Sequence, residues 1–148
     1  PEGVGAAVIP LWVAALMRNA PLRIHGDGET SRDFCFVDNV VQANILAALA
    51  GREAAGEVFN VGVGERTTLN QLYGMLREAL AERFPHVAGH RPDHADFRRG
   101  DVRHSQADTG KAERLLGYRP THRIGAGLAQ ALDWYVRNLP PHPLHEPK

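Results

Sequence analysis

The sequence predicts an α/β fold, because segments with a helical spacing of apolar residues alternate with short runs typical of strands. In residues 7–19 the apolar side chains recur at intervals of three and four, as they do on one face of an amphipathic helix. Residues 21–25 form an extended run that ends at the turn signal of residues 26–28. Two further strand-like runs, at 32–37 and 57–61, are each followed by a helical pattern.

The second predicted helix begins at Asp38 or Asn39, because either side chain can cap a helix that runs through Ala50. Its apolar positions define the face that we expect to point inward. These positions are Val41, Ile45, Ala48 and Leu49.

The second half of the chain predicts three helices around one long connection. A helical pattern follows Thr68, and residues 81–107 then read as a mostly irregular segment. Asp108 is expected to cap a short helix that ends at Gly117, and residues 124–139 predict the last helix. We therefore expect one folded portion, residues 1–139, followed by a tail at 140–148.

The composition excludes several classes of function. Lys plus Arg and Asp plus Glu both total 17, and this balance argues against a general nucleic-acid-binding protein. No apolar run reaches the roughly 18 residues that span a bilayer, so no membrane association is predicted. The single cysteine, Cys35, cannot form an internal disulfide, and a cytoplasmic location is the expectation. The helical pattern close to Pro1 suggests a piece of a longer protein.

Gly62-Val63-Gly64 follows a predicted strand and precedes a predicted helix, as in a dinucleotide-binding fingerprint. The third glycine of that fingerprint would fall at position 67, which is threonine. A tight strand-to-helix turn therefore explains these glycines better than a cofactor loop does.

Three histidines, His86, His90 and His94, lie four residues apart, the spacing of metal ligands on a helix. Pro85 and Pro92 interrupt any such helix, so a solvated loop is the favoured interpretation and no metal site is predicted.

The arginines leave two interpretations open. A diphosphate site needs fixed positive charge, and a guanidinium group gives bidentate contacts to phosphate oxygens. Arg32 follows a glycine-rich turn, and Arg98 and Arg99 lie close to Asp101. Surface ion pairs with neighbouring aspartates would explain the same pattern equally well.

Three stretches together resemble the C-terminal region of the extended short-chain dehydrogenase/reductase superfamily, in its NAD-dependent epimerase/dehydratase family. They are residues 26–34 with 37–39 after them, residues 59–62, and residues 98–105 with 107–118 after them. Their order and spacing match over most of residues 1–139. Within this family, residues 6–12 and 100–105 look most similar to bacterial UDP-N-acetylglucosamine 4-epimerases of surface-polysaccharide synthesis.

The resemblance implies the C-terminal, substrate-binding part of an extended Rossmann-type fold. The family's glycine-rich NAD loop and its catalytic Tyr-x-x-x-Lys pair lie in an N-terminal half that this chain does not contain. The resemblance thus implies a parent enzyme that interconverts UDP-GlcNAc and UDP-GalNAc through a 4-keto sugar. NAD and the homodimer contacts would belong to the other half, and the chain alone would be inactive, with no catalytic residue of its own.

The resemblance also assigns five residues to the nucleotide. Arg32 and Arg98 would hold the diphosphate, and Asp101 would bind the ribose of uridine. Arg23 and His25 would border the uracil.

Four further residues are assigned to the sugar. Ala7, Val8 and Trp12 would line the wall beside it, and Ser105 would face its acetamido group. Three alternatives remain open: a nucleotide-sugar dehydratase, a UDP-uronate epimerase and a non-catalytic binding module.

Overall fold

The computed structural model describes residues 7–139 and divides into two compact units. The first unit comprises residues up to Gly28, Leu69–Arg99 and residues from Ala129 onward. The second unit comprises Glu29–Thr68 and Gly100–Leu128. Each unit is therefore built from segments that are distant in the sequence. The predicted tail at 140–148 lies outside the described residues.

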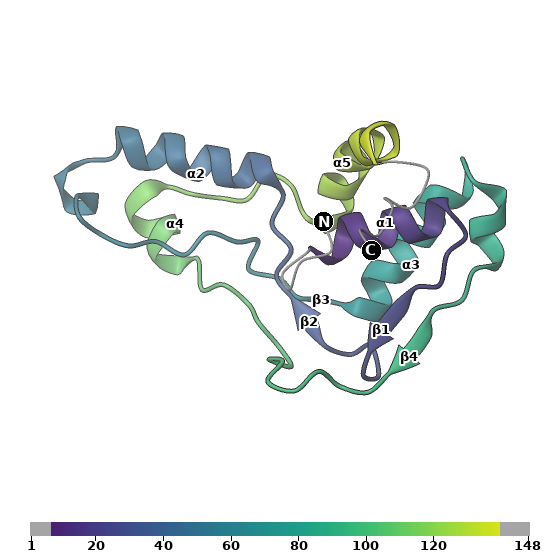
Figure 1. The fold of residues 1–148 in the computed structure, drawn as a ribbon. Helices are drawn as coiled ribbons and strands as arrows, with labels where there is room; N and C mark the ends of the chain where they lie inside the picture. The colour runs from purple at the N-terminus through teal and green to yellow at the C-terminus, as the bar shows by residue number, and fades with distance from the viewer. Residues whose placement is uncertain (1–6, 140–148) are drawn as a thin grey trace, which may run out of the picture. The chain divides into compact units, whose positions relative to one another are not determined.

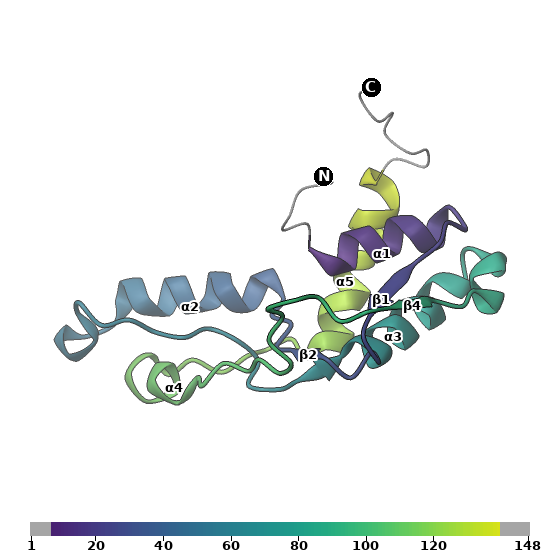
Figure 2. The same ribbon diagram turned by 60° about the horizontal axis from the view of Figure 1, so that its bottom comes forward.

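The first unit combines helices with a pair of parallel strands (Figure 1). Helix α1 spans Val8–Met17 and packs against α3, Leu69–Ala81. Strand β1, Arg23–His25, pairs in parallel with β4, Asp93–Ala95, and Figure 2 shows the two running side by side. The core consists of residues from these elements and the segments beside them: Trp12, Val13, Leu16, Leu22, Ile24, Leu72, Tyr73, Leu76, Leu80 and Val87.

The segment 81–107 is more ordered than the sequence predicted. It contains a 3₁₀ helix, η2 at Pro85–Gly89, whose Val87 is fully buried, and then β4. The pairing of β4 begins with the Asp93 amide donating to the Leu22 carbonyl at 2.8 Å. A strand held by a partner some 70 residues away leaves no periodic signal in its own segment, so the sequence did not reveal β4, although most of the segment is irregular as predicted.

The second unit is built on short elements. Strand β2, Ser31–Arg32, pairs antiparallel with β3, Thr67–Thr68. Helix α2, Val37–Leu49, packs against α4, Gly110–Leu116, and the 3₁₀ helix η1, Arg52–Ala54, also contacts α4 (Figure 1). The core of this unit is small and contains Ala43, Ala54, Ala112, Leu116 and Tyr118.

Two strand predictions were wrong or too long. Of the run predicted at 32–37 only Arg32 belongs to a strand, as the second residue of β2, and α2 already begins at Val37. The run at 57–61 forms no regular strand. Within residues 7–139 no strand pairs with residues 33–37 or 57–61, and an extended segment becomes a strand only when a neighbour satisfies its backbone hydrogen bonds.

The inward face predicted for α2 was also wrong. Val41, Ile45 and Leu49 are 48%, 55% and 80% exposed, and Ala48 is exposed as well. The buried residues are Asn39 and Ala43, which lie on the opposite side of the helix. Because α4 is the helix that packs against α2 within the second unit, the side that faces α4 is the one that becomes core.

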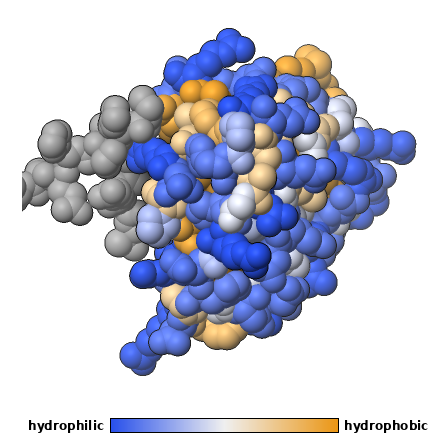
Figure 3. All heavy atoms as spheres, turned by 90° about the vertical axis from the view of Figure 1, so that its right-hand side faces the viewer, coloured by the Kyte–Doolittle hydropathy of each residue, from blue (hydrophilic) through white to orange (hydrophobic). Residues whose placement is uncertain are grey.

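The last helix, α5, spans Ile124–Asn138, as predicted, with Leu128 and Leu132 buried. Gly117 ends α4 with φ of +68°, the left-handed conformation that glycine adopts easily at a helix end. Between residues 7 and 139, no helix has the length and apolar character needed to cross a bilayer. On the face drawn in Figure 3, apolar side chains are scattered among hydrophilic ones, as on ordinary protein surfaces.

Candidate functional site

The candidate site lies in the second unit, where residues 103–105 run alongside β2. The Ser31 amide donates to the Arg103 carbonyl at 2.9 Å, and the Ser105 amide donates to the Ser31 carbonyl at 3.1 Å. Ser31 and His104 form a parallel bridge, and the Ser31 hydroxyl lies 2.8 Å from His104 Nδ1. These bonds fix the position of Ser105, whose side chain is exposed.

Arg32 and Asp101, both assigned to the nucleotide, are in contact. Nη2 of Arg32 donates to Oδ1 of Asp101 at 2.5 Å, and Nη1 donates to the Ser31 carbonyl at 2.9 Å. The two side chains are 31% and 37% exposed, so solvent screens this ion pair. The structure thus brings together a fixed cation and a carboxylate at one accessible place.

Asp33, the residue after β2, accepts hydrogen bonds from three backbone amides. Its Oδ1 accepts from Val63 at 2.9 Å, and its Oδ2 accepts from Gly64 at 3.0 Å and from Ala107 at 3.2 Å. The carboxylate therefore joins the turn at 62–64 to the segment that carries Ser105.

This arrangement decides how the Gly62-Val63-Gly64 turn is used. A dinucleotide loop presents its amides to a pyrophosphate, but here the amides of Val63 and Gly64 are donated to a carboxylate of the same chain. The turn therefore does not fit NAD, which agrees with the preferred interpretation of its sequence.

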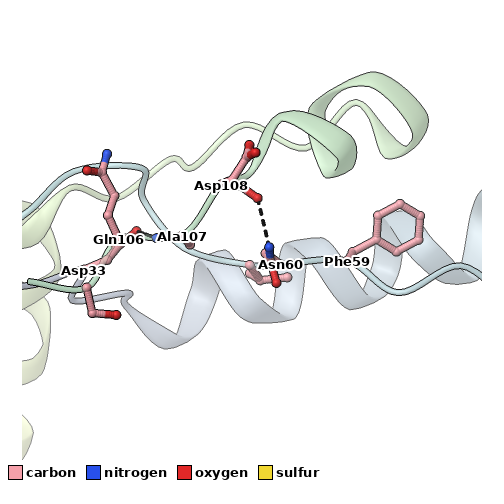
Figure 4. Close-up of a pocket in the computed structure, with 8 residues that line it drawn as sticks. Asp33, Phe59, Asn60, Gln106, Ala107 and Asp108 are labelled. Carbon is pink, nitrogen blue, oxygen red and sulfur yellow. Dashed lines mark hydrogen bonds between the residues drawn. The ribbon is translucent and has the colours of Figure 1, made fainter. Parts of the chain in front are cut away.

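An open cavity of about 400 Å³ lies beside these residues (Figure 4). Its wall is mostly polar and is braced by Asn60 Nδ2, which donates to the Asp108 carbonyl at 3.3 Å. The lining residues are Asp33, Phe59, Asn60, Val61, Ser105, Gln106, Ala107 and Asp108. Ser105 is the only one of these that was assigned to the substrate.

Tyr118 also holds the turn at 62–64 in place. Its ring is buried, and its hydroxyl donates to the Gly62 carbonyl at 2.7 Å. Burial, with the neighbouring Cys35 and Asp33 adding to it, raises the pKa of Tyr118 to about 12. Burial likewise raises the pKa of the Cys35 thiol. Both groups therefore stay protonated at neutral pH.

The other predicted site residues belong to the first unit. Arg23 and Arg98 are exposed, and His25 Nδ1 lies 3.2 Å from the Asp96 carbonyl. Of the three residues assigned to the sugar wall, Ala7 is exposed and Val8 is half-buried.

Trp12, the third residue of that predicted wall, is part of the core of the first unit. It is 7% exposed, and its ring meets the ring of Tyr73 edge-on at 6.4 Å between centroids. Core packing accounts for this side chain.

The three evenly spaced histidines do not converge. His86 Nε2, His90 Nε2 and His94 Nδ1 lie 2.8–3.1 Å from three different backbone carbonyls, and the buried His90 also contacts the hydroxyl of Tyr73. The solvated-loop interpretation was therefore wrong for His90. In the described part of the chain, no three His, Cys, Asp or Glu side chains gather as a metal site would require.

Two residues that organise the second unit were missed from the sequence. Asp33 was not singled out, because the aspartates near the arginines were considered only as partners in surface ion pairs. Asn39 was considered as a helix cap, but it is fully buried inside α2. Its Oδ1 accepts from the amides of Thr121 at 2.9 Å and His122 at 3.1 Å, and its Nδ2 donates to the His122 carbonyl at 2.7 Å. A polar residue within a helical pattern was the available signal.

Comparison with known proteins agrees with the fold. Residues 1–62 match the model of the NAD dependent epimerase/dehydratase family. A UDP-glucose 4-epimerase of Mycolicibacterium smegmatis is 32% identical over 133 residues, which cover 88% of this chain and 39% of that protein. dTDP-glucose 4,6-dehydratases and a UDP-glucuronate 4-epimerase also match. The chain spans about two fifths of the length of these relatives.

Two solved structures are similar over nearly the whole chain. The UDP-glucose 4-epimerase of Thermotoga maritima, solved with UDP-glucose, matches 95% of this chain and 42% of its own, with TM-score 0.81 and 35% identity. The UDP-N-acetylglucosamine 4-epimerase of Methanobrevibacter ruminantium, solved with UDP-N-acetylmuramic acid, matches 93% of this chain and 42% of its own, with TM-score 0.78 and 29% identity.

The fold of this chain is that of one part of an extended Rossmann-type protein. The chain belongs to the NAD dependent epimerase/dehydratase family, as the sequence motifs predicted.

Proposed function

We propose that this chain is the UDP-sugar-binding portion of a nucleotide-sugar 4-epimerase whose parent interconverts UDP-GlcNAc and UDP-GalNAc. The observation that carries the proposal is the cluster formed by Arg32, Asp101 and Ser105. A guanidinium group, a carboxylate and a small hydroxyl side chain are held by one short pair of segments, 31–32 and 101–105.

Each side chain suits one part of a UDP-sugar. Arg32 supplies two nitrogen donors for the diphosphate, and Asp101 supplies acceptors for ribose hydroxyls. Ser105 is small and lines a cavity with room for an acetamido group. The contact between Arg32 and Asp101 would be exchanged for contacts to the ligand, at little cost because it is exposed.

The remaining assignments complete the proposal. Arg98, Arg23 and His25 would bind the nucleotide, and Ala7 and Val8 would line the sugar wall. NAD, the catalytic pair and the contacts of a homodimer would be supplied by the N-terminal half of the parent, because the glycine turn at 62–64 donates its amides to Asp33 and not to a pyrophosphate. A 4,6-dehydratase or a UDP-glucuronate 4-epimerase is the nearest alternative. The small side chain at Ser105, which leaves space beside the sugar, favours the acetamido sugar.

Nuclear magnetic resonance titration tests the proposal directly on the 148-residue chain. Addition of UDP should shift the amide signals of Arg32, Asp101 and Ser105, whereas AMP at the same concentration should leave them in place. The chain alone should not interconvert UDP-GlcNAc and UDP-GalNAc. A titration in which UDP moves no signal in the second unit would contradict the proposed function.

Replacing Ser105 by tyrosine should change the preference among sugars. The added ring would fill the volume that an acetamido group needs, so UDP-GlcNAc affinity should fall about tenfold relative to UDP-glucose affinity, as expected for a steric rejection. The measurement is the ratio of the two dissociation constants by calorimetry. The control Ser105→Ala leaves the space open and should preserve the ratio. Equal losses for both sugars in the tyrosine variant would remove Ser105 from the sugar pocket.

A further inference from the structure

Asp33 lies in the second unit and lines the same cavity as Ser105. Its two oxygens accept three backbone hydrogen bonds, from Val63, Gly64 and Ala107, all between 2.9 and 3.2 Å. The segment 103–107 is bonded to Ser31 at Arg103 and to Asp33 at Ala107, and Ser105 lies between these two points. Ser105 is therefore held from both ends, by Ser31 on one side and by Asp33 on the other.

The residues around the Asp33 carboxylate are closely packed. A Cβ atom added to Gly62 would lie 2.6 Å from Asp33 Oδ2 and 2.6 Å from the Cβ of Ala107, closer than a real Cβ atom approaches a non-bonded neighbour. The Gly62 carbonyl is held by the buried Tyr118 hydroxyl, and the side chain of Gln106 donates to the Gly64 carbonyl. The turn at 62–64 therefore packs closely against the segment that carries Ser105, and the Asp33 carboxylate is hydrogen-bonded to both.

From this geometry we infer that Asp33 is a positioning residue for the sugar subsite, and that its carboxylate sets where Ser105 stands in the cavity. The inference rests on the proposed function for the identity of the ligand. Three N–H donors converge on this side chain, so it must offer acceptors only. An ionised carboxylate does so, because both of its oxygens accept and neither donates. Charge-assisted bonds of this kind are stronger than neutral ones, so they hold a loop more firmly than water would.

The substitution Asp33→Asn tests the inference with almost no change of shape. The amide has one oxygen and one NH₂ group, so in either orientation the NH₂ group must face at least one of the three N–H donors. We expect hydrogen exchange at the amides of Ala107 and Ser105 to become about tenfold faster, with exchange in α1 unchanged. UDP-GlcNAc affinity should fall about tenfold and UDP affinity less than threefold, because only the sugar contacts Ser105.

Asp38→Asn is the matched control, because it removes the same charge from an exposed position in the first turn of α2. It should leave the exchange of both amides and the two affinities as in the original chain. Unchanged exchange at Ser105 and Ala107 in Asp33→Asn would overturn the inference. Equal losses of UDP and UDP-GlcNAc affinity would also overturn it, since a general loss of structure lowers both.

A second variant covers the case in which Asp33→Asn does not fold. Gly62→Ala keeps the carboxylate but forces the turn and Ala107 apart, so it should speed exchange at Ser105 in the same way, and a failure to do so would count against the inference. If UDP moves no signal in the original chain, the proposed function fails. The exchange rates at Ser105 and Ala107 then still decide whether Asp33 positions this segment.

Discussion

Replacing Arg32 by alanine should weaken UDP binding by about 1.5–3 kcal/mol, which corresponds to roughly 10- to 150-fold in the dissociation constant. The reason is that hydrogen bonds from a charged donor to diphosphate oxygens are among the stronger ones in water. Nη1 of Arg32 is already held by the Ser31 carbonyl at 2.9 Å, so the guanidinium group loses little further freedom when it binds. Calorimetric titration of the chain with UDP measures the loss.

The matched control for Arg32 is Arg119→Ala. Arg119 belongs to the same unit, is 83% exposed and lies 3.9 Å from Glu113, so its removal takes away a positive charge without touching the candidate site. UDP affinity should change by less than twofold. Equal effects of the two substitutions would mean that UDP responds only to the overall charge, and Arg32 would lose its assigned role. Asp101→Asn should weaken UDP binding less than Arg32→Ala, because it also releases Arg32.

Replacing Asn39 by alanine should lower the free energy of unfolding by about 2–4 kcal/mol. The side chain is fully buried and bonded to both residues 121 and 122. Its loss leaves the His122 carbonyl and two backbone amides without the partner they have in the folded chain. A buried polar group left unsatisfied costs about 1–3 kcal/mol, so the combined loss exceeds that of one bond.

Urea unfolding followed by circular dichroism measures the loss at Asn39. Asn44→Ala, on an exposed position of the same helix, removes the same amide and should change stability by less than about 0.5 kcal/mol. If the two variants unfold at the same urea concentration, the bonds from Asn39 to residues 121–122 contribute nothing to stability.

The helices show how much the sequence alone can predict. For α1, α3 and α5 the spacing of apolar residues predicted the helix, and apolar residues of that spacing, such as Leu16, Leu72 and Leu128, are buried. This succeeds because a helix satisfies its own backbone hydrogen bonds, so the pattern within the segment carries the information. The three motif stretches identified the family in the same way, because their signal lies in the residues themselves.

The candidate site was predictable only in part. The sequence motifs singled out Arg32, Asp101 and Ser105, and the structure places them on one pair of segments. The sequence could not show that Asp33 accepts hydrogen bonds from the amides of residues 63, 64 and 107, because those contacts join residues 30 to 74 positions apart. No pattern within a short window distinguishes an aspartate that pairs with an arginine from one that gathers backbone amides.

The sequence by itself determined the α/β class, the main helices and the family. Only the tertiary structure decided the pairing of β1 with β4, the exposed apolar face of α2 and the roles of Asp33 and Asn39. The physical reason is the same in each case. Strand pairing, burial of one face and the satisfaction of a polar side chain all depend on a partner that lies far along the chain, whereas a helix carries most of its partners within itself.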